Sequence, residues 1–144
     1  MALSAILQGV RRIALDTGPL IYTFERHAVH FAQVEPVIAA IDAGTLRGIA
    51  STLALIETLV GPLQSGNAAL ADTYRRALTR APNLELLPVD AAVAELAATI
   101  RALHRFKTPD AIHLATAVHA GADAFLTNDA QLRAFPGVRV VLVS

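Results

Sequence analysis

The sequence predicts one α/β domain, an α/β/α sandwich around a central, largely parallel sheet of about four to five strands. The chain has 144 residues, of which 54% are apolar and 17% charged. Short apolar runs alternate along it with longer helical segments, which is typical of a parallel sheet covered by helices. A chain of this length forms one domain without disulfides or a structural metal. We therefore expect a single domain over 1–144, with 1–11 as an N-terminal extension of uncertain structure.

The first apolar run, 13–15, stops at Asp16-Thr17-Gly18-Pro19 and is typical of a buried strand that ends in a turn. A helix is expected to follow over 20–25. The next helix, over 32–43, carries a proline in its early turns and a stop signal at Gly44.

A second strand is expected over 46–50. Ser51 or Thr52 can cap the helix after it, which Gly61-Pro62 is expected to end. Another helix begins at Ser65-Gly66-Asn67 and ends before Pro82.

In the last part of the chain, cap residues and turns again separate strands from helices. Strands are expected over 84–87, 124–127 and 139–143. Helices are expected from Asp90 to His104, from Thr108 to the stop at Gly121, and from Asp129 to Phe135.

The charge balance and the lack of cysteine exclude several classes of protein. Twelve Lys and Arg balance twelve Asp and Glu, which argues against a generic basic nucleic-acid binder. The absence of cysteine excludes thiol catalysis, thiolate zinc sites and iron-sulfur clusters. No apolar stretch is long enough to span a bilayer, and Arg11 and Arg12 follow the first apolar stretch instead of preceding it as in a secretory signal. We expect a cytoplasmic protein that does not bind membranes.

Two acidic residues are expected at the carboxyl ends of strands, where parallel sheets bind ligands. Asp16 directly follows the first strand, and Asp129 follows the fourth after Thr127 and Asn128. Each could instead be only a helix cap, because Asp often has that role after a strand. Together the two acids favour a site at this sheet edge.

Glu57 is expected to face the core. On a helix it falls within the apolar stripe formed by Leu53, Ile56 and Val60. A buried carboxylate needs a cation, a metal or several hydrogen-bond donors. The structural alternative is an ion pair with an arginine.

Asp110 shares a helix face with Leu114 and Ala117. As the second helical residue it could instead have no role beyond a favourable interaction with the helix dipole.

Four acids at one edge would repel one another, and one or two divalent cations would relieve the repulsion. Ligands that offer only oxygen favour Mg²⁺ or Mn²⁺. Such a site can activate water and stabilise charge on a phosphodiester, so the inferred reaction is phosphoryl transfer to water.

Four segments resemble, in order, the motifs of the PIN domain family, and most closely those of VapC-type ribonuclease toxins. The segments are LDTGPLIY at 15–22, STLALIE at 51–57, TPDAIHLATA at 108–117 and AFLTND at 124–129. The resemblance implies a metal-dependent endoribonuclease, the toxin of a VapBC-type toxin–antitoxin system. The residues that it implies as catalytic and as ligands of Mg²⁺ or Mn²⁺ are Asp16, Glu57, Asp110 and Asp129.

The resemblance also implies an RNA substrate, a homodimer, and a cognate antitoxin whose tail enters the active-site groove. Thr17 matches a small hydroxyl residue that supports the site. Gly18 departs from the pattern, because related motifs commonly carry Asn or Ser there. A hydrogen bond near the site is therefore missing or comes from the backbone.

Residues around the acids are candidates for supporting roles. Thr127 and Asn128 are expected to orient Asp129 or a water molecule. His113 follows Asp110 by one turn and could contact the site, although a packed core histidine is the favoured expectation. The candidates for contacts with RNA phosphates, or else for a solvated helix end that favours bases, are Arg101, Arg105 and Lys107.

Other enzyme classes fit less well. A haloacid-dehalogenase-like phosphatase needs a second Asp at the position of Gly18, and a receiver domain needs paired acids near the first strand and a late lysine. Two alternatives stay open. The chain could be a PIN-fold RNA-processing nuclease outside a toxin module, or a PIN-fold protein that binds RNA or a partner without catalysis.

Overall fold

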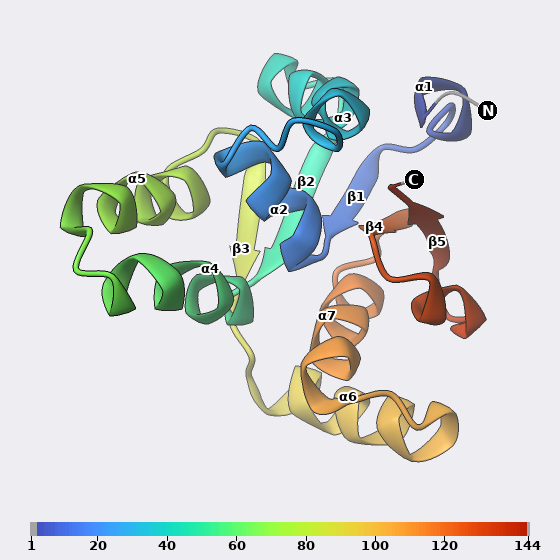
Figure 1. The fold of residues 1–144 in the computed structure, drawn as a ribbon. Coiled ribbons are helices and arrows are strands. Elements are labelled where there is room, and N and C mark those ends of the chain that lie inside the picture. The colour runs from blue at the N-terminus through green and yellow to red at the C-terminus, as the bar shows by residue number, and fades with distance from the viewer. Residues whose placement is uncertain (1–2, 144) are drawn as a thin grey trace.

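A computed structural model describes residues 3–143 and contains a five-stranded sheet (Figure 1). All strand pairings are parallel, in the order β3-β2-β1-β4-β5. The predicted parallel sheet is thus confirmed. The strands are β1 (Arg12–Leu15), β2 (Arg47–Ser51), β3 (Leu84–Leu87), β4 (Ala124–Thr127) and β5 (Arg139–Leu142).

Helices connect the strands at most of the predicted places. They are α1 (Leu3–Ile6), α2 (Thr17–Phe24), α3 (Phe31–Ala43), α4 (Leu53–Gln64), α5 (Ala68–Thr79), α6 (Ala91–His104), α7 (Thr108–His119) and the 3-10 helix η1 (Ala130–Ala134). Asp90 caps α6 as predicted, since its side chain accepts a hydrogen bond from the amide of Val93 at 3.0 Å. None of the helices within residues 3–143 has the length and apolar character needed to cross a membrane.

Two helix boundaries differ from the prediction. α2 begins at Thr17, three residues before the predicted start, because Asp16 caps the amide of Thr17 and Pro19 fits a first helical turn. α4 continues through Gly61 and Pro62 to Gln64, although these two residues are predicted to end it. Gly61 has no Cβ to collide with the following proline ring, and the ring of Pro62 is buried. Tertiary packing therefore outweighs the local signal for a helix end.

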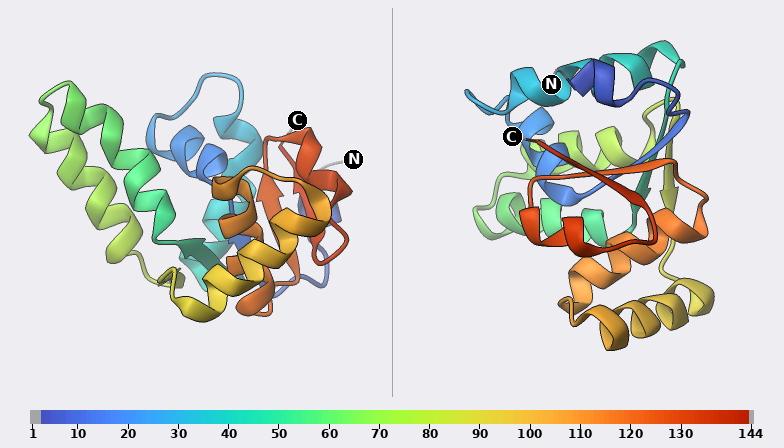
Figure 2. Two further views of the ribbon diagram at one scale, coloured as in Figure 1. Left: turned by 90° about the horizontal axis from the view of Figure 1, so that it is seen from below. Right: turned by 90° about the vertical axis from the view of Figure 1, so that its right-hand side faces the viewer.

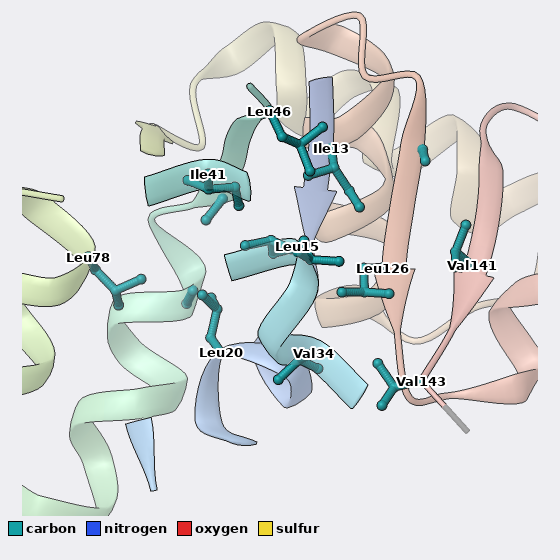
Figure 3. Packing of buried hydrophobic residues seen from close by; sticks show 14 residues of the cluster. Ile13, Leu15, Leu20, Val34, Ile41, Leu46, Leu78, Leu126, Val141 and Val143 are labelled. Atoms are coloured by element: carbon teal, nitrogen blue, oxygen red, sulfur yellow. The ribbon is translucent and has the colours of Figure 1, made fainter. Parts of the chain in front are cut away.

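The sheet separates two hydrophobic clusters, as expected for an α/β/α sandwich. Ile13 and Leu15 of β1 point into the first cluster, which α2, α3, α4 and α5 cover (Figure 3). Ala14 points to the opposite face, toward α6, α7 and η1. The partly buried Leu3 and Ile6 of α1 pack against the first cluster. Helices α4 and α5 lie side by side and extend away from the sheet (Figure 2).

Candidate active site

Two predicted site residues lie where the strand order of the sheet reverses. The chain runs from β1 outward to β2 and β3, then returns to place β4 on the other side of β1. Ligands bind at such switch points, beyond the carboxyl ends of the strands. Asp16 follows β1 and Asp129 follows β4. Both also cap helices, because Asp16 accepts from the amide of Thr17 at 2.8 Å and Asp129 from that of Gln131 at 2.9 Å.

Thr127 connects these two residues. Its buried hydroxyl donates to Oδ2 of Asp16 at 2.6 Å and accepts a hydrogen bond from the backbone amide of Asp129 at 3.0 Å. The amide of Asp16 donates to the carbonyl of Leu126 at 2.9 Å. The end of β4 therefore fixes Asp16 and the backbone of Asp129 relative to each other.

Glu57 reaches the site from α4. Its Oε1 accepts a hydrogen bond from the hydroxyl of Thr17 at 2.7 Å and lies 2.6 Å from Nε2 of His113. The hydrogen bond with His113, with a smaller contribution from Thr17, lowers the pKa of Glu57 despite the opposing effect of burial. Glu57 is thus a carboxylate paired with a histidine, and the alternative of an ion pair with an arginine is wrong.

The orientation predicted for α4 is wrong. Ile56 and Val60, which the periodicity places on the core face, are 67% and 48% exposed. The buried side chains of α4 are Ala54, Thr58 and Pro62. Because α4 is apolar on most of its sides, periodicity alone did not determine which side packs inward.

Asp110 lies in the first turn of α7, and the charges of the other three acids act on it. Burial raises the pKa of Asp110, and the negative charges of Asp16, Asp129 and Glu57 raise it further, while His113 acts in the opposite direction. Among the hydrogen bonds of residues 3–143, none reaches its carboxylate. Burial and the neighbouring acids therefore disfavour the charged form of the Asp110 carboxyl group.

His113 is a contact residue for which the sequence interpretation favoured a packed core position over a place in the site. It is packed, as predicted, with 2% of its side chain exposed. However, its Nε2 also lies 3.2 Å from Oγ1 of Thr17 and 3.7 Å from Oδ1 of Asp16, in addition to its contact with Glu57. The available signal was its spacing of three residues from Asp110, which places both side chains on one helix face.

Comparison with known protein families matches the PIN domain to residues 13–138. The chain belongs to the PIN domain family. Curated protein sequences give no match.

Solved structures of toxin–antitoxin proteins share the fold of this PIN domain. VapBC2 from Rickettsia felis, bound to a promoter DNA fragment, has a TM-score of 0.73 at 14% identity over 92% of this chain and 99% of that chain. A toxin–antitoxin complex from Klebsiella pneumoniae has a TM-score of 0.68 at 24% identity over 90% and 95%. VapC20 from Mycobacterium tuberculosis, a toxin that cleaves the sarcin-ricin loop, has a TM-score of 0.67 at 17% identity over 88% and 98%.

The acids of this PIN domain suit a divalent cation in charge and donor type. They offer only oxygen ligands, as Mg²⁺ and Mn²⁺ prefer. Burial is the main cause of the raised pKa of Asp110, and the negative charge of the neighbouring acids, which a cation would neutralise, adds to it. Within residues 3–143, no group of three or more His, Asp or Glu side chains is arranged so that it could hold a metal ion. The four acids thus share an electrostatic field without forming a complete coordination shell.

Asn128 accounts for the unusual glycine of the first motif. A Cβ at Gly18 would lie 2.1 Å from Oδ1 of Asn128, so the asparagine side chain fills the space that a side chain at position 18 would take. Its Nδ2 donates to the hydroxyl of Tyr22 at 3.0 Å. Asn128 therefore fastens the loop after β4 to α2, and the backbone amide of Asp129 donates instead to the hydroxyl oxygen of Thr127.

The three predicted RNA-contact residues surround the start of α7. Arg101, Arg105 and Lys107 are all exposed. Lys107 is the N-cap residue of α7, three positions before Asp110, and Arg101 donates to the hydroxyl of Thr108. Lys107 and Arg101 therefore lie beside the first turn of α7, which carries Asp110.

Proposed function

We propose that this PIN domain is a Mg²⁺- or Mn²⁺-dependent endoribonuclease that hydrolyses RNA phosphodiester bonds. Its metal-binding and catalytic residues are Asp16, Glu57, Asp110 and Asp129. The observation that carries the proposal is the gathering of four carboxylates, from the ends of β1 and β4 and from α4 and α7, at the switch point of the sheet. Repulsion between like charges disfavours the folded state. A cation bound between the carboxylates would offset this repulsion and could also bind a phosphate of the substrate.

The chain's own hydroxyl groups prepare the site. Thr127 holds one oxygen of Asp16, and Thr17 holds one oxygen of Glu57. Fixing these oxygens in advance avoids reorganisation when substrate arrives. When bound, a divalent cation supplies an activated water and stabilises the negative charge that develops on the phosphodiester. Lys107, Arg101 and Arg105 are proposed to bind phosphates of the RNA strand.

Within this class we propose the toxin of a VapBC-type system, acting in the cytoplasm as a homodimer and inhibited by a cognate antitoxin. The solved structures of similar fold include toxin–antitoxin complexes. The exposed side chains of Ile56, Val60 and Leu63 form an apolar strip along α4, next to Glu57. An exposed apolar patch beside a polar site is typical of a protein interface, and we assign this strip to the antitoxin.

Cleavage of RNA by the purified protein tests the enzymatic proposal. We expect cleavage with Mn²⁺ or Mg²⁺ and none with EDTA. Asp16→Asn and Asp110→Asn should each lower kcat by about a hundredfold or more, while Glu95→Gln, an exposed acid on α6, should have no effect. Cleavage without metal, or full activity of both Asn variants, would contradict the proposal. RNA binding without cleavage would favour the non-catalytic alternative.

Co-expression separates the toxin from an RNA-processing enzyme with the same site. We expect the gene immediately upstream to encode a small protein with a DNA-binding head and a basic or hydrophobic tail. Its product should co-purify with this chain and suppress its nuclease activity, and Ile56→Glu should weaken the complex. If the upstream gene encodes no such protein, an RNA-processing role outside a toxin module becomes the better proposal.

A further inference from the structure

His113 is a buried histidine that contacts three elements of the site. It comes from α7, and its Nε2 lies 2.6 Å from Oε1 of Glu57 on α4 and 3.2 Å from Oγ1 of Thr17 on α2. Only 2% of its side chain is exposed. A histidine in this position can fix a carboxylate by a hydrogen bond from the buried side of the site.

The surrounding hydrogen bonds determine which ring nitrogen carries the proton. The hydroxyl of Thr17 donates its only proton to Glu57 at 2.7 Å, so toward His113 its oxygen must accept. A bare Nε2 at 2.6 Å from a carboxylate oxygen would place two lone pairs against each other, so Nε2 must be the donor. Nδ1 is buried without a hydrogen-bond partner among residues 3–143, and a bare nitrogen there costs less than an orphaned N–H group.

Glu57 depends on this donor for a defined position. Its side chain is 33% exposed and has three rotatable bonds, so without a partner it would sample many rotamers. His113 and Thr17 both engage Oε1, and the hydrogen bonds within residues 3–143 leave Oε2 without a protein donor. One oxygen is therefore held while the other stays available.

We propose that His113 is a positioning residue, whose Nε2–H holds Oε1 of Glu57 so that Oε2 remains available to a divalent cation. The inference rests on the proposed metal site, and it assigns His113 no direct contact with the cation or RNA. Groups that orient metal-binding side chains in this way typically change metal affinity by about ten- to a hundredfold.

Mn²⁺ affinity of the metal-free protein, measured by calorimetry, tests this role. His113→Met keeps an apolar side chain of similar size but removes the donor, and we expect it to weaken Mn²⁺ binding about tenfold. His113→Gln restores an N–H near the position of Nε2 and should recover most of the affinity. Thr116→Val is the matched control, because Thr116 is buried on the same helix and, among residues 3–143, its hydroxyl bonds only to the carbonyl of Ile112.

A double-variant cycle shows whether His113 acts through Glu57. In a Glu57→Gln background, His113→Met should weaken Mn²⁺ binding little further, because the carboxylate that it positions is absent. An unchanged affinity of His113→Met, or an equal loss in both backgrounds, would overturn the proposal. Because calorimetry needs no RNA, a protein that binds Mn²⁺ but does not cleave RNA would refute the enzymatic function and leave this role intact.

The metal-free wild-type protein provides a second readout that does not depend on the folding of any variant. A long-range ¹H–¹⁵N spectrum should show His113 protonated on Nε2 and bare on Nδ1. Glu57→Gln should shift the Nε2 signal, and Thr116→Val should not. A proton on Nδ1 with a bare Nε2 would overturn the assignment.

Discussion

Individual side chains in this site are held mainly by hydroxyl groups and one histidine. Thr127 binds Asp16, Thr17 binds Glu57, and His113 lies between the two acids. Asp110 differs from these acids because no donor among residues 3–143 reaches its carboxylate and the neighbouring acids repel it. Burial and the neighbouring acids therefore disfavour the charged form of Asp110 in the metal-free protein, and a bound cation would favour that form.

Replacing Asp110 with Asn should stabilise the metal-free protein. The pKa of Asp110 is raised in the folded state, so its favourable contribution is complete below its unfolded-state pKa and is lost as pH rises through the folded-state pKa. At neutral pH the amide avoids this loss. We expect the Tm in EDTA to rise by about 2 °C, since solvent screens a partly exposed carboxylate, with a smaller gain near pH 4. Glu95→Gln should leave Tm unchanged. A Tm of Asp110→Asn equal to or below that of the wild type would show that the charge of Asp110 does not destabilise the folded protein.

Replacing Glu57 with Gln should preserve the fold and weaken metal binding. The amide oxygen can still accept the hydrogen bonds from Thr17 and His113, but the negative charge is gone. We expect Mn²⁺ affinity to fall about tenfold with little change in Tm. Calorimetry that shows an unchanged Mn²⁺ affinity would leave Glu57 with a structural role only.

Secondary structure elements contribute to the site through their ends. β1 and β4 place Asp16 and Asp129 beside each other, and α7 begins with the turn that carries Asp110.

Away from the site, Asp123 fastens the start of β1 to the segment before β4. Its Oδ2 accepts hydrogen bonds from the amides of Arg11 at 3.0 Å and Arg12 at 2.9 Å.

Loss of the Asp123 carboxylate should weaken this connection. The two backbone hydrogen bonds, that of Arg11 first, lower the pKa of Asp123. Its contribution is therefore present above the unfolded-state pKa and is lost as pH falls through the lower folded-state value. We expect Asp123→Ala to lower Tm at pH 7 by about 2 °C, because an exposed group contributes modestly. Asp123→Asn keeps an acceptor and should lose less; equal Tm values for Asp123→Ala and wild type would contradict this role.

The whole molecule carries no net charge, so the proposed interaction with RNA depends on where the charges lie. The acids gather at the switch point, while Arg101, Arg105 and Lys107 surround the start of α7. A cation at the acids would reverse the local field toward phosphate. Neutral overall charge is therefore compatible with an RNA-cleaving enzyme.

Salt dependence of RNA binding tests the proposed role of Lys107. In the Asp16→Asn background, which prevents cleavage, Lys107→Gln should reduce the slope of log affinity against log salt by about 0.7, the value for one phosphate contact on a single strand. The control is Arg80→Gln, an exposed cation at the end of α5. Equal slopes for Lys107→Gln and the control would remove Lys107 from the RNA path.

Most of the fold was predictable because its signals are local. Apolar runs marked the strands, and Asp90 and Gly44 marked helix ends through hydrogen bonding and left-handed backbone geometry. The end of α4 was not predictable from Gly61-Pro62, because burial of the proline ring decided it. The exposure of Ile56 likewise depends on which face of α4 packs against the protein.

The sequence by itself determined the α/β class, the four acidic candidates and their order along the chain, since strand ends and helix starts are local properties. Only the tertiary structure decided how those acids are held. Thr127, Thr17 and His113 come from segments far apart in the sequence, and their hydrogen bonds exist only once the sheet order places β4 beside β1 and α7 against α4. Distances between such segments are set by packing, and no local pattern encodes them.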